Sequence, residues 1–484
     1  MTTDGTPGPL SPDFRSEAQR RRDGRIAAAQ SQALANGNAD PGQGDEKIRH
    51  LQAIRERLQS GPGAPPDQIE VIWPEEPGQR PPILVVQGEL LLREPTAPPP
   101  GAGHDDRAEG DRGGDTDAYQ QAVELLGTLG YHPQVQRDHR RDVLPFQTFR
   151  THDKDGAALV SDRNQVREAT GADIDLNYVC VTGYTTKDDD TPVLTIVDPA
   201  YPPPGLGPDP VLRPITIAVI DTGINRGGRT DGWLATIDET GQNEDLLDVL
   251  PANGILDASA GHGTFVSGVL QQVAPQSTVV VYKDLDTDGF GNVADIGAAI
   301  ISAAAAGADI INLSAATPAV ADEIPSALLS AVQTVQDQYP DVLIVASAGN
   351  NGSDVPMYPA AIPGVIGVAA LKAAPSVTSP LTPVDWSSFG DWVTCSTVGV
   401  GIASTFVPGT EAETNGTTEK FGADAWAIWS GTSFSAPQIA AAVAWHCQVS
   451  PTPITPIDAL NLRVLNGAPT EAGYGALVRF LPGS

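Results

Sequence analysis

Short apolar segments alternate with alanine-rich segments over the carboxy-terminal part of this 484-residue chain. The apolar runs, of which Ile215–Ile220 is the first, are nearly continuous and have the length of strands that are buried on both faces of a parallel sheet. The alanine-rich segments between them have the length of helices. In order, the later strands and helices are expected at Val279–Tyr282, Val293–Ala306, Ile310–Leu313, Ile324–Gln338, Val342–Ala346 and Val365–Ala370. This alternation predicts an α/β fold, a doubly wound parallel sheet with helices on both faces.

Three polar residues lie at ends of these predicted elements. Asp221 comes directly after Ile215–Ile220, at the carboxyl end of a strand, where open α/β sheets place their functional groups. His262 lies between two glycines at the start of a predicted helix, and Asn350 follows a glycine at the end of another strand. A single histidine or asparagine more often has a structural role. The three together indicate a functional site.

The segment Gly431–Pro437 predicts a tight turn that leads directly into a long alanine-rich helix. Gly431 permits the turn, and Pro437 lies where the first turn of a helix can spare an N–H group. Ser433 is then expected at the helix N-terminus, where unpaired N–H groups and the positive end of the helix dipole face outward. Such a serine can be an ordinary N-cap. It can also be a nucleophile, because an oxyanion formed beside it would meet hydrogen-bond donors already in place.

Four motifs occur in the order that is typical of the subtilisin-like serine proteases, which the chain resembles: Asp-Thr-Gly at 221–223, Gly-His-Gly-Thr at 261–264, Ala-Gly-Asn at 348–350 and Gly-Thr-Ser-Phe-Ser-Ala-Pro at 431–437. The resemblance implies a serine endopeptidase that acts on protein or peptide substrates and needs no cofactor. It implies that Asp221 orients His262 and that His262 accepts the proton of Ser433, the nucleophile. Asn350 and the backbone N–H of Ser433 would hold the oxyanion.

Two other functions are to be weighed against this one. Asp-Thr-Gly is also the signature of aspartic proteases, but these need two such motifs or a small dimer with one motif in each chain. The sequence contains no second Asp-Thr-Gly or Asp-Ser-Gly, and it is far too long for the dimeric type. The second alternative is a catalytically idle peptide-binding protein whose groove is filled by its own amino-terminal domain.

The resemblance also implies a groove in which an extended peptide pairs with two edge segments. These segments consist of Gly289, Phe290 and Gly291 on one side and Leu313, Ser314, Ala315 and Ala316 on the other. Relatives usually carry glycine where Ala316 stands, so this edge is expected to be tighter. Met357 takes the place of a small residue near the floor of the primary pocket. A thioether there should shorten the pocket and favour small or medium apolar residues before the scissile bond.

Two segments bear on whether the chain binds calcium. Asp284–Gly289 matches the start of an EF-hand loop, with Asp295 at the twelfth position. However, Gly291 occupies the eighth position, which is normally apolar, and a strand rather than a helix precedes the loop. In many secreted relatives a loop inserted into the helix after the histidine binds calcium, but here Gly268–Pro275 leads directly to the next strand. We therefore predict no metal and no cofactor.

The chain before the predicted catalytic domain (213–484) divides into three parts. Residues 1–70 are hydrophilic and are predicted to be disordered. Residues 71–184 have a strand–helix–strand–helix–strand pattern that resembles the small α/β, ferredoxin-like inhibitory propeptide of the family, interrupted by an acidic Pro/Gly loop at 95–116. Residues 185–212 are predicted to be a linker. We expect an autoinhibited zymogen that is activated by a cut between about Thr185 and Arg213.

Composition narrows the partners and the compartment. The formal net charge of −31 argues against nucleic acid or anionic membranes as partners. The longest apolar stretches are well short of a membrane span. No charged-then-apolar secretory pattern is visible at the amino terminus, and three cysteines suit reduced thiols better than a disulfide framework. We expect a cytoplasmic protein, with export by an unrecognised route as the alternative.

Overall fold

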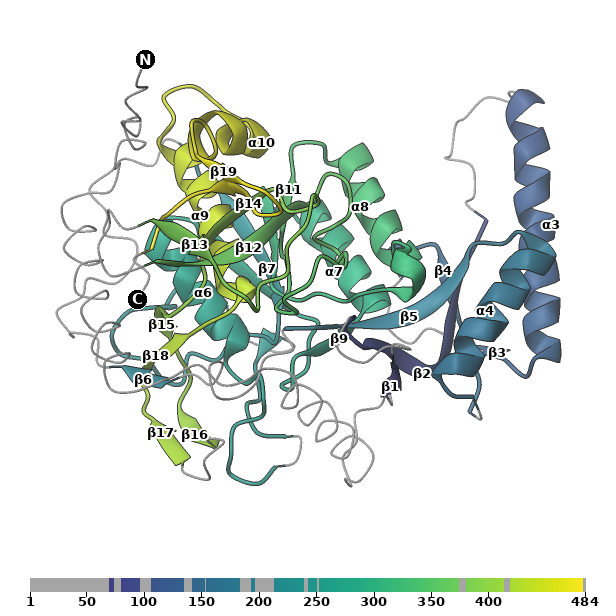
Figure 1. Cartoon of the computed structure of the whole chain (residues 1–484), viewed down its shortest axis with the longest axis horizontal. Helices are drawn as coiled ribbons and strands as arrows, with labels where there is room; N and C mark the ends of the chain where they lie inside the picture. Colours follow the sequence, from purple (N-terminus) through teal and green to yellow (C-terminus); the bar gives the residue numbers. More distant parts are fainter. Residues whose placement is uncertain are drawn as a thin grey trace, which may run out of the picture.

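The computed structural model describes residues 69–73, 80–95, 106–134, 142–152, 154–182, 193–195, 213–238, 243–249, 252–373, 380–412 and 418–481. Within these residues the chain forms two units that lie side by side, an amino-terminal domain up to Thr182 and a carboxy-terminal domain from Arg213 (Figure 1). The segments predicted to be disordered (1–70) and to form a linker (185–212) lie outside the described residues, except for residues 69–70 and 193–195.

The carboxy-terminal domain is built on a sheet with the strand order β19-β20-β14-β12-β11-β10-β7-β8. Its main strands are all paired in parallel, whereas β13 and β19 pair antiparallel at its margin. The order reverses between β7 and β10, which is the switch point where α/β sheets place their sites. The predicted doubly wound parallel sheet is confirmed. The bounds of the strands are β7 Thr216–Asp221, β8 Thr278–Lys283, β10 Ile310–Leu313, β11 Leu343–Ser347, β12 Ile366–Ala373, β13 Leu381–Pro383, β14 Cys395–Val398, β19 Thr470–Glu471 and β20 Gly475–Leu477.

Helices cover both faces of this sheet because its strands are apolar on both faces. In β7, Ile217 and Val219 pack into one core, together with helices α6 (His262–Val273) and α9 (Thr432–Val449). Their neighbours Ala218 and Ile220 pack into a second core on the opposite face. Side chains alternate between the two faces of a strand, so a strand covered on both sides must be continuously apolar. Helices α7 (Val293–Ala305) and α8 (Ser326–Gln338) form the cover on the second face.

The other elements of this domain are small. Strand β15 (Ile402–Thr405) pairs antiparallel with β18 (Trp426–Trp429), and β16 (Gly409–Ala412) pairs with β17 (Thr418–Phe421). On its other side β18 pairs with β6 (Val193–Thr195), so part of the predicted linker is a strand of the carboxy-terminal domain. Short helical segments complete the domain: a 3-10 turn at Val320–Asp322, α10 at Pro456–Ala459 and a π-turn at Leu460–Val464.

The amino-terminal domain is an antiparallel sheet with the order β3-β4-β2-β5, in which β1 also pairs with β2. Its elements are β1 Ile69–Ile72, β2 Ile83–Arg93, α3 Asp106–Thr128, β3 His132–Pro133, β4 Phe146–Arg150, α4 Gly156–Thr170 and β5 Ile174–Val181. One boundary of the prediction was wrong: the loop expected at 95–116 ends earlier, because α3 already begins at Asp106. Ala108 and Glu109 are good helix formers, and the Pro and Gly content of the neighbouring residues concealed this.

The two domains share one core and one ladder. Leu90 and Tyr178 of the amino-terminal domain belong to the same buried cluster as Ile296 and Ile300 of α7. Strand β5 runs out of its own sheet and pairs antiparallel with β9 (Phe290–Asn292) of the carboxy-terminal domain (Figure 1). The end of β5 is thereby brought to the switch point of the large sheet.

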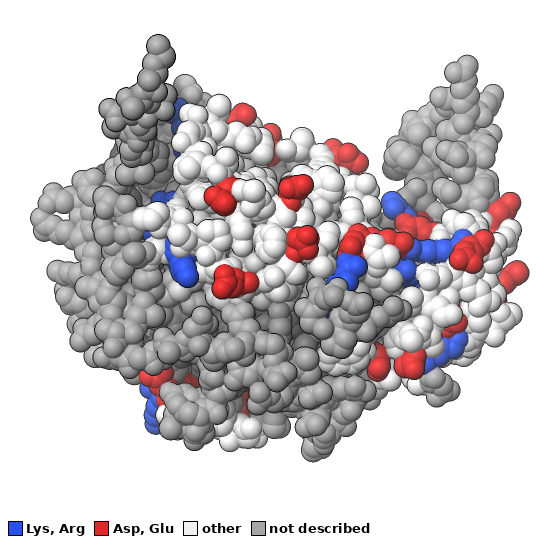
Figure 2. Space-filling view, viewed as in Figure 1, with Lys and Arg blue, Asp and Glu red and all other residues white. Residues whose placement is uncertain are grey.

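The charge of the surface and the apolar character of the helices bear on whether the protein binds nucleic acid or a membrane. Figure 2 shows more acidic than basic side chains on the visible face, with both kinds lying close together where the domains meet. Among the described residues, no helix combines the length and the apolar character needed to cross a membrane.

Candidate active site

Asp221 and His262 form a buried pair at the carboxyl end of β7. His262 Nδ1 lies 2.7 Å from Asp221 Oδ1, which also accepts a hydrogen bond from the backbone N–H of Thr222 at 2.8 Å. The side chain of Asp221 is fully buried, and the imidazole is stacked edge-on against Trp429 and tilted against Phe434. The carboxylate therefore fixes which nitrogen of the imidazole faces it, and the aromatic rings fix the plane of the ring.

A second buried carboxylate, that of Asp245, links the residue after Asp221 to the residue before His262. Asp245 Oδ2 accepts hydrogen bonds from Thr222 Oγ1 at 3.0 Å and from the backbone N–H of Gly261 at 2.8 Å. Thr222 Oγ1 in turn accepts one from the N–H of Gly263. Burial raises the pKa of Asp245 to about 6, against the opposing effect of these hydrogen bonds and of the nearby Lys283 charge. Asp245 lies in an irregular loop and belongs to none of the four motifs, so no sequence pattern marks it as part of the site.

The glycines around His262 are required by close packing. A Cβ atom on Gly263 would lie 2.2 Å from the carbonyl oxygen of Gly223, and Gly261 has a φ of 81°. Helix α6 can therefore begin directly against the end of β7 only with glycine at these places. The motif Gly-His-Gly is thus explained by the approach of two backbones.

Ser433 lies in the first turn of α9, as predicted from the Gly-Thr-Ser motif, and is buried. Its hydroxyl oxygen lies within hydrogen-bond distance of two backbone carbonyl oxygens, those of Thr182 at 2.8 Å and Ser314 at 3.1 Å, and its single proton can be donated to one of them at a time. Ser314 Oγ donates back to the carbonyl of Ser433 at 2.9 Å. Neither hydrogen bond of the Ser433 hydroxyl goes to His262, although the neighbouring Phe434 packs on the imidazole. The hydroxyl is turned toward the end of β5.

Asn350 follows β11 and faces the start of α9. Its Oδ1 accepts hydrogen bonds from the backbone N–H of Thr432 at 3.0 Å and from Thr432 Oγ1 at 2.8 Å. The oxygen end of the carboxamide is therefore occupied, and the amino group is the end left for an acceptor that carries negative charge. Asn351, the other asparagine of this turn, donates to Met357 Sδ at 3.3 Å.

The two predicted edge segments enclose the end of β5. Val181 and Ala316 exchange both of their backbone hydrogen bonds, at 3.0 and 2.9 Å. On the other side Cys180 lies opposite Gly291, and the N–H of Thr182 donates to the carbonyl of Gly289 at 3.1 Å. An extended segment of the chain itself thus occupies the predicted groove.

The remaining residues predicted for the groove lie around this segment. Leu313 is the last residue of β10, and Ala315 is buried just beyond it. Phe290 packs into a small cluster with Val179 and Val181 of β5. Met357 is buried beside Gly349, with its Cε 3.3 Å from the position that a Cβ on Gly349 would take.

The acidic segment Asp284–Gly289 forms a turn before β9. Asp286 Oδ1 accepts hydrogen bonds from the backbone N–H groups of Asp288 at 3.0 Å and Phe290 at 2.9 Å. Burial raises the pKa of Asp286 to about 7. Among the described residues, no group of three or more His, Cys, Asp or Glu side chains could hold a metal ion. The carboxylate of Asp286 shapes the turn that leads into the edge strand.

Comparison with known proteins decides the family. A model of the subtilase family matches residues 213–471, which is more than half of the chain. The chain belongs to the subtilase family. This subtilase is 31% identical over 230 residues to the thermophilic serine proteinase of Bacillus sp. (strain AK1), covering 46% of this chain and 50% of that protein. It is 30% identical over 259 residues to mycosin-4 of Mycobacterium tuberculosis, and this match covers 46% of this chain and 53% of mycosin-4. The subtilase thus spans about half the length of these relatives.

A solved structure supports the fold of the subtilase. The crystal structure of fervidolysin from Fervidobacterium pennivorans, described as a keratinolytic enzyme related to subtilisin, aligns with a TM-score of 0.51 over 82% of this chain and 60% of that chain. The sequence identity is 20%. The likeness extends beyond the carboxy-terminal domain, because 82% of the chain includes part of the residues before Arg213.

Proposed function

We propose that this subtilase is a serine endopeptidase that hydrolyses protein or peptide substrates held as an extended strand between β9 and residues 314–316. The observation that carries the proposal is the contact of 2.8 Å between Ser433 Oγ and the carbonyl oxygen of Thr182. A peptide carbonyl thus lies within reach of a hydroxyl at a helix N-terminus, beside the buried pair of His262 and Asp221.

In this mechanism the Ser433 hydroxyl turns from the carbonyl of Ser314 to His262 and gives its proton to Nε2 as Oγ attacks the peptide carbonyl carbon. Asp221 stabilises the positive charge on the imidazole through Nδ1. The Asn350 amino group and the Ser433 N–H donate to the oxyanion. His262 then protonates the leaving amine, and water hydrolyses the acyl-enzyme by the same route in reverse.

We further propose that the amino-terminal domain makes the protein a zymogen. A segment that pairs with both edges of the groove excludes other peptides. Because it is tethered, its effective concentration is on the order of millimolar, so even a weakly bound sequence would keep the groove filled. The contacts of Val181 and Thr182 with Ala316 and Gly289 support this proposal.

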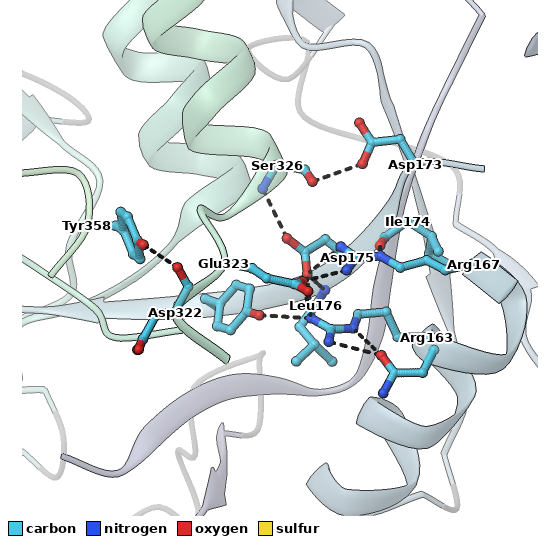
Figure 3. A network of polar contacts seen from close by, with 12 residues as sticks. Arg163, Arg167, Asp173, Ile174, Asp175, Leu176, Asp322, Glu323, Ser326 and Tyr358 are labelled. Atoms are coloured by element: carbon cyan, nitrogen blue, oxygen red, sulfur yellow. Dashed lines mark hydrogen bonds and ion pairs between the residues drawn. The ribbon is translucent and has the colours of Figure 1, made fainter. Parts of the chain in front are cut away.

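A network of polar contacts supports the docking of the amino-terminal domain (Figure 3). The buried carboxylate of Asp175 accepts a hydrogen bond from the N–H of Ser326, at the start of α8, at 3.0 Å, and it pairs with Arg163 of its own domain at 3.2 Å. Arg167 reaches across to Glu323 at 2.5 Å. An acidic group at a helix N-terminus is favourable, so Asp175 also acts as a cap supplied by the other domain.

The contact at Ser433 also refines the expected site of activation. The sequence alone suggested a cut between about Thr185 and Arg213, within the linker. Among the described residues, the carbonyl of Thr182 lies nearest to Ser433 Oγ. The Thr182 side chain contacts Ser259, whereas the pocket beside Met357 would take the residue before the scissile bond. We therefore propose a cut one or two residues beyond Thr182, upstream of that range. Strand β6 would then stay with the carboxy-terminal domain through its pairing with β18.

A fluorophosphonate probe and a processing assay test these proposals. Wild type should be labelled at Ser433 and should yield a fragment whose first residue lies within a few positions after Thr182, as read by mass spectrometry. Full-length Ser433→Ala should be neither labelled nor cut. If wild type is never labelled, even after partial denaturation and refolding, the endopeptidase proposal is wrong.

One alternative is favoured by the same observation, since an idle peptide-binding protein would also have a filled groove. It differs in predicting no covalent labelling of Ser433 and no cleavage under any condition. The probe experiment therefore separates the two functions directly.

For the compartment we propose a reducing one such as the cytoplasm. Cys180, Cys395 and Cys447 are all unpaired and buried, and burial raises the pKa of each thiol, to about 12 for Cys395 and about 11 for Cys447. Thiols of this kind are inert, and none of them needs an oxidising environment. We propose no nucleic acid or membrane partner, in keeping with the net charge of −31.

A further inference from the structure

The side chain of Thr182 occupies a small polar site that the proposed mechanism does not use. Its hydroxyl oxygen lies 2.9 Å from Ser259 Oγ, although the two residues are 77 positions apart in the sequence. Ser259 is buried and stands three residues before His262, whose N–H donates to the Ser259 carbonyl at 3.0 Å. A hydroxyl built into the approach to the histidine thus meets the hydroxyl of the segment in the groove.

The site is rigid because Ser259 is held on several sides. Its backbone N–H donates to the carbonyl of Thr287 at 2.9 Å, and its hydroxyl donates to the carbonyl of Asp288 at 3.2 Å. Thr287 is itself held by the buried carboxylate of Asp257, at 2.5 Å. A neighbouring contact, from the N–H of Ala258 to Asp288 Oδ1 at 3.0 Å, ties the same two segments together.

The two hydroxyls and the backbone carbonyl of Asp288 can form one chain of hydrogen bonds. A serine hydroxyl has one proton and two lone pairs. When Ser259 donates its proton to the carbonyl of Asp288, its oxygen faces the groove as an acceptor that a donor there can satisfy. The hydroxyl of threonine or serine supplies one. A valine side chain, although it has nearly the shape of threonine, supplies none.

Gly289, which forms one wall of the site, also limits the size of the side chain that can occupy it. A Cβ atom added to Gly289 would lie 2.4 Å from Thr182 Oγ1 and 2.5 Å from Ser259 Oγ, so the absence of a side chain at Gly289 is what makes room for the pair of hydroxyls. The N–H of Thr182 is bonded to the carbonyl of the same glycine, which fixes the distance of the side chain from that wall. A short side chain with a β-hydroxyl fits this space.

From this geometry we propose that Ser259 is a specificity-determining residue: the subtilase selects substrates with threonine or serine at the position that Thr182 occupies. The inference rests on the proposed endopeptidase function and adds a substrate class to it. One net hydrogen bond contributes about 0.5–1.5 kcal/mol, so the preference for threonine over valine should be about fivefold in kcat/KM, within about two- to twelvefold.

The test uses three peptides that span residues 177–188, with Cys180 replaced by alanine in all of them and threonine, serine or valine at position 182. Full-length wild type and full-length Ser259→Ala are compared, with rates given per Ser433 titrated by the fluorophosphonate probe. Wild type should cleave the threonine and serine peptides about five times faster than the valine peptide. In Ser259→Ala the ratio of threonine to valine should fall to about one, because both peptides then meet a methyl group.

Two results would overturn the inference: a threonine-to-valine ratio below two in wild type, or a ratio that persists in Ser259→Ala. Thr182→Val in full-length Ser433→Ala, with and without Ser259→Ala, gives the same comparison without hydrolysis, from the rate of amide hydrogen exchange in residues 178–182. Thr182→Val should raise this rate about fivefold when Ser259 is present and should leave it unchanged in Ser259→Ala. If no peptide is cleaved and Ser433 is never labelled, the endopeptidase function fails, and the exchange ratio alone decides whether Ser259 selects the hydroxyl.

Discussion

Substitution of Glu323 tests whether charge holds the two domains together. Glu323 Oε2 lies 2.5 Å from Arg167 Nη1 and 3.5 Å from Arg163 Nη1, and both arginines belong to α4 of the other domain (Figure 3). Glu323→Gln keeps the shape of the side chain and removes its charge. The arginines keep Asp175 as a partner, so the folding of the amino-terminal domain should be little affected.

The size of the expected effect follows from the solvent exposure of the Glu323 side chain. The side chain of Glu323 is 47% exposed, so water screens both pairs, although Arg163 itself is buried. Ion pairs of this kind contribute up to about 1 kcal/mol each. Together they should stabilise docking by up to about 2 kcal/mol, and a loss of about 1.4 kcal/mol makes the undocked state about tenfold more populated.

The assay is the rate at which a fluorophosphonate labels Ser433 in the uncleaved full-length chain, read from the full-length band on a gel. Because the probe needs an open groove, its rate is proportional to the undocked fraction. Glu323→Gln should be labelled about ten times faster than wild type at low salt, and the ratio should shrink in molar salt, where charges are screened within about 3 Å. Asp337→Asn, which removes an exposed charge at the far end of α8, should leave the rate unchanged.

Equal labelling rates for wild type and Glu323→Gln would refute this reasoning. They would mean that the shared apolar core and the pairing of β5 hold the domains together without help from these ion pairs. A faster rate that does not respond to salt would equally contradict an electrostatic origin.

The remaining predictions concern the site. Asn350→Ala should lower kcat by about a hundred- to a thousandfold, the loss known for the corresponding asparagine of subtilisin. A kcat close to that of wild type would exclude a role for Asn350 at the oxyanion. In the same peptidase assay Ser433→Ala should lower kcat by about a millionfold, again the subtilisin value. Because burial raises the pKa of Asp245 from 3.8 to about 6, Asp245 holds an extra proton in the folded chain between pH 3.8 and pH 6, and its contribution to the free energy of unfolding falls as the pH rises through this range. Asp245→Asn lacks this titration, so its Tm relative to wild type should rise between pH 4 and pH 7, and a constant difference by calorimetry would contradict the shift. Met357→Gly should extend cleavage to peptides with Phe or Tyr before the scissile bond, which wild type should cut poorly; efficient cleavage of these peptides by wild type would show that Met357 does not shorten the pocket.

Local patterns in the sequence were sufficient for the large sheet and for most positions of the site. The continuous apolar run of β7 predicts a strand covered on both faces, and its end places Asp221 at the switch point. The helix predicted from Val293 begins at that residue in α7, because Asn292 caps it through the N–H of Asp295. Such signals are readable because periodicity and caps are properties of neighbouring residues.

Contacts between distant segments were not readable in this way. No motif marks Asp245 as the link between Thr222 and Gly261, and nothing near Ser259 indicates that its hydroxyl meets Thr182. These pairings depend on how irregular loops cross in space. A loop has no period from which its partner could be derived.

The sequence by itself therefore determined the element order, the doubly wound sheet and the four motif residues that lie around its switch point. Only the tertiary structure decided that β5 leaves its own sheet to pair with β9 and Ala316, and that part of the predicted linker pairs with β18. The reason is physical. An apolar stretch of sequence predicts its own burial. An extended segment, in contrast, can pair with any strand edge that is left free, and the free edges are known only when the whole chain has folded.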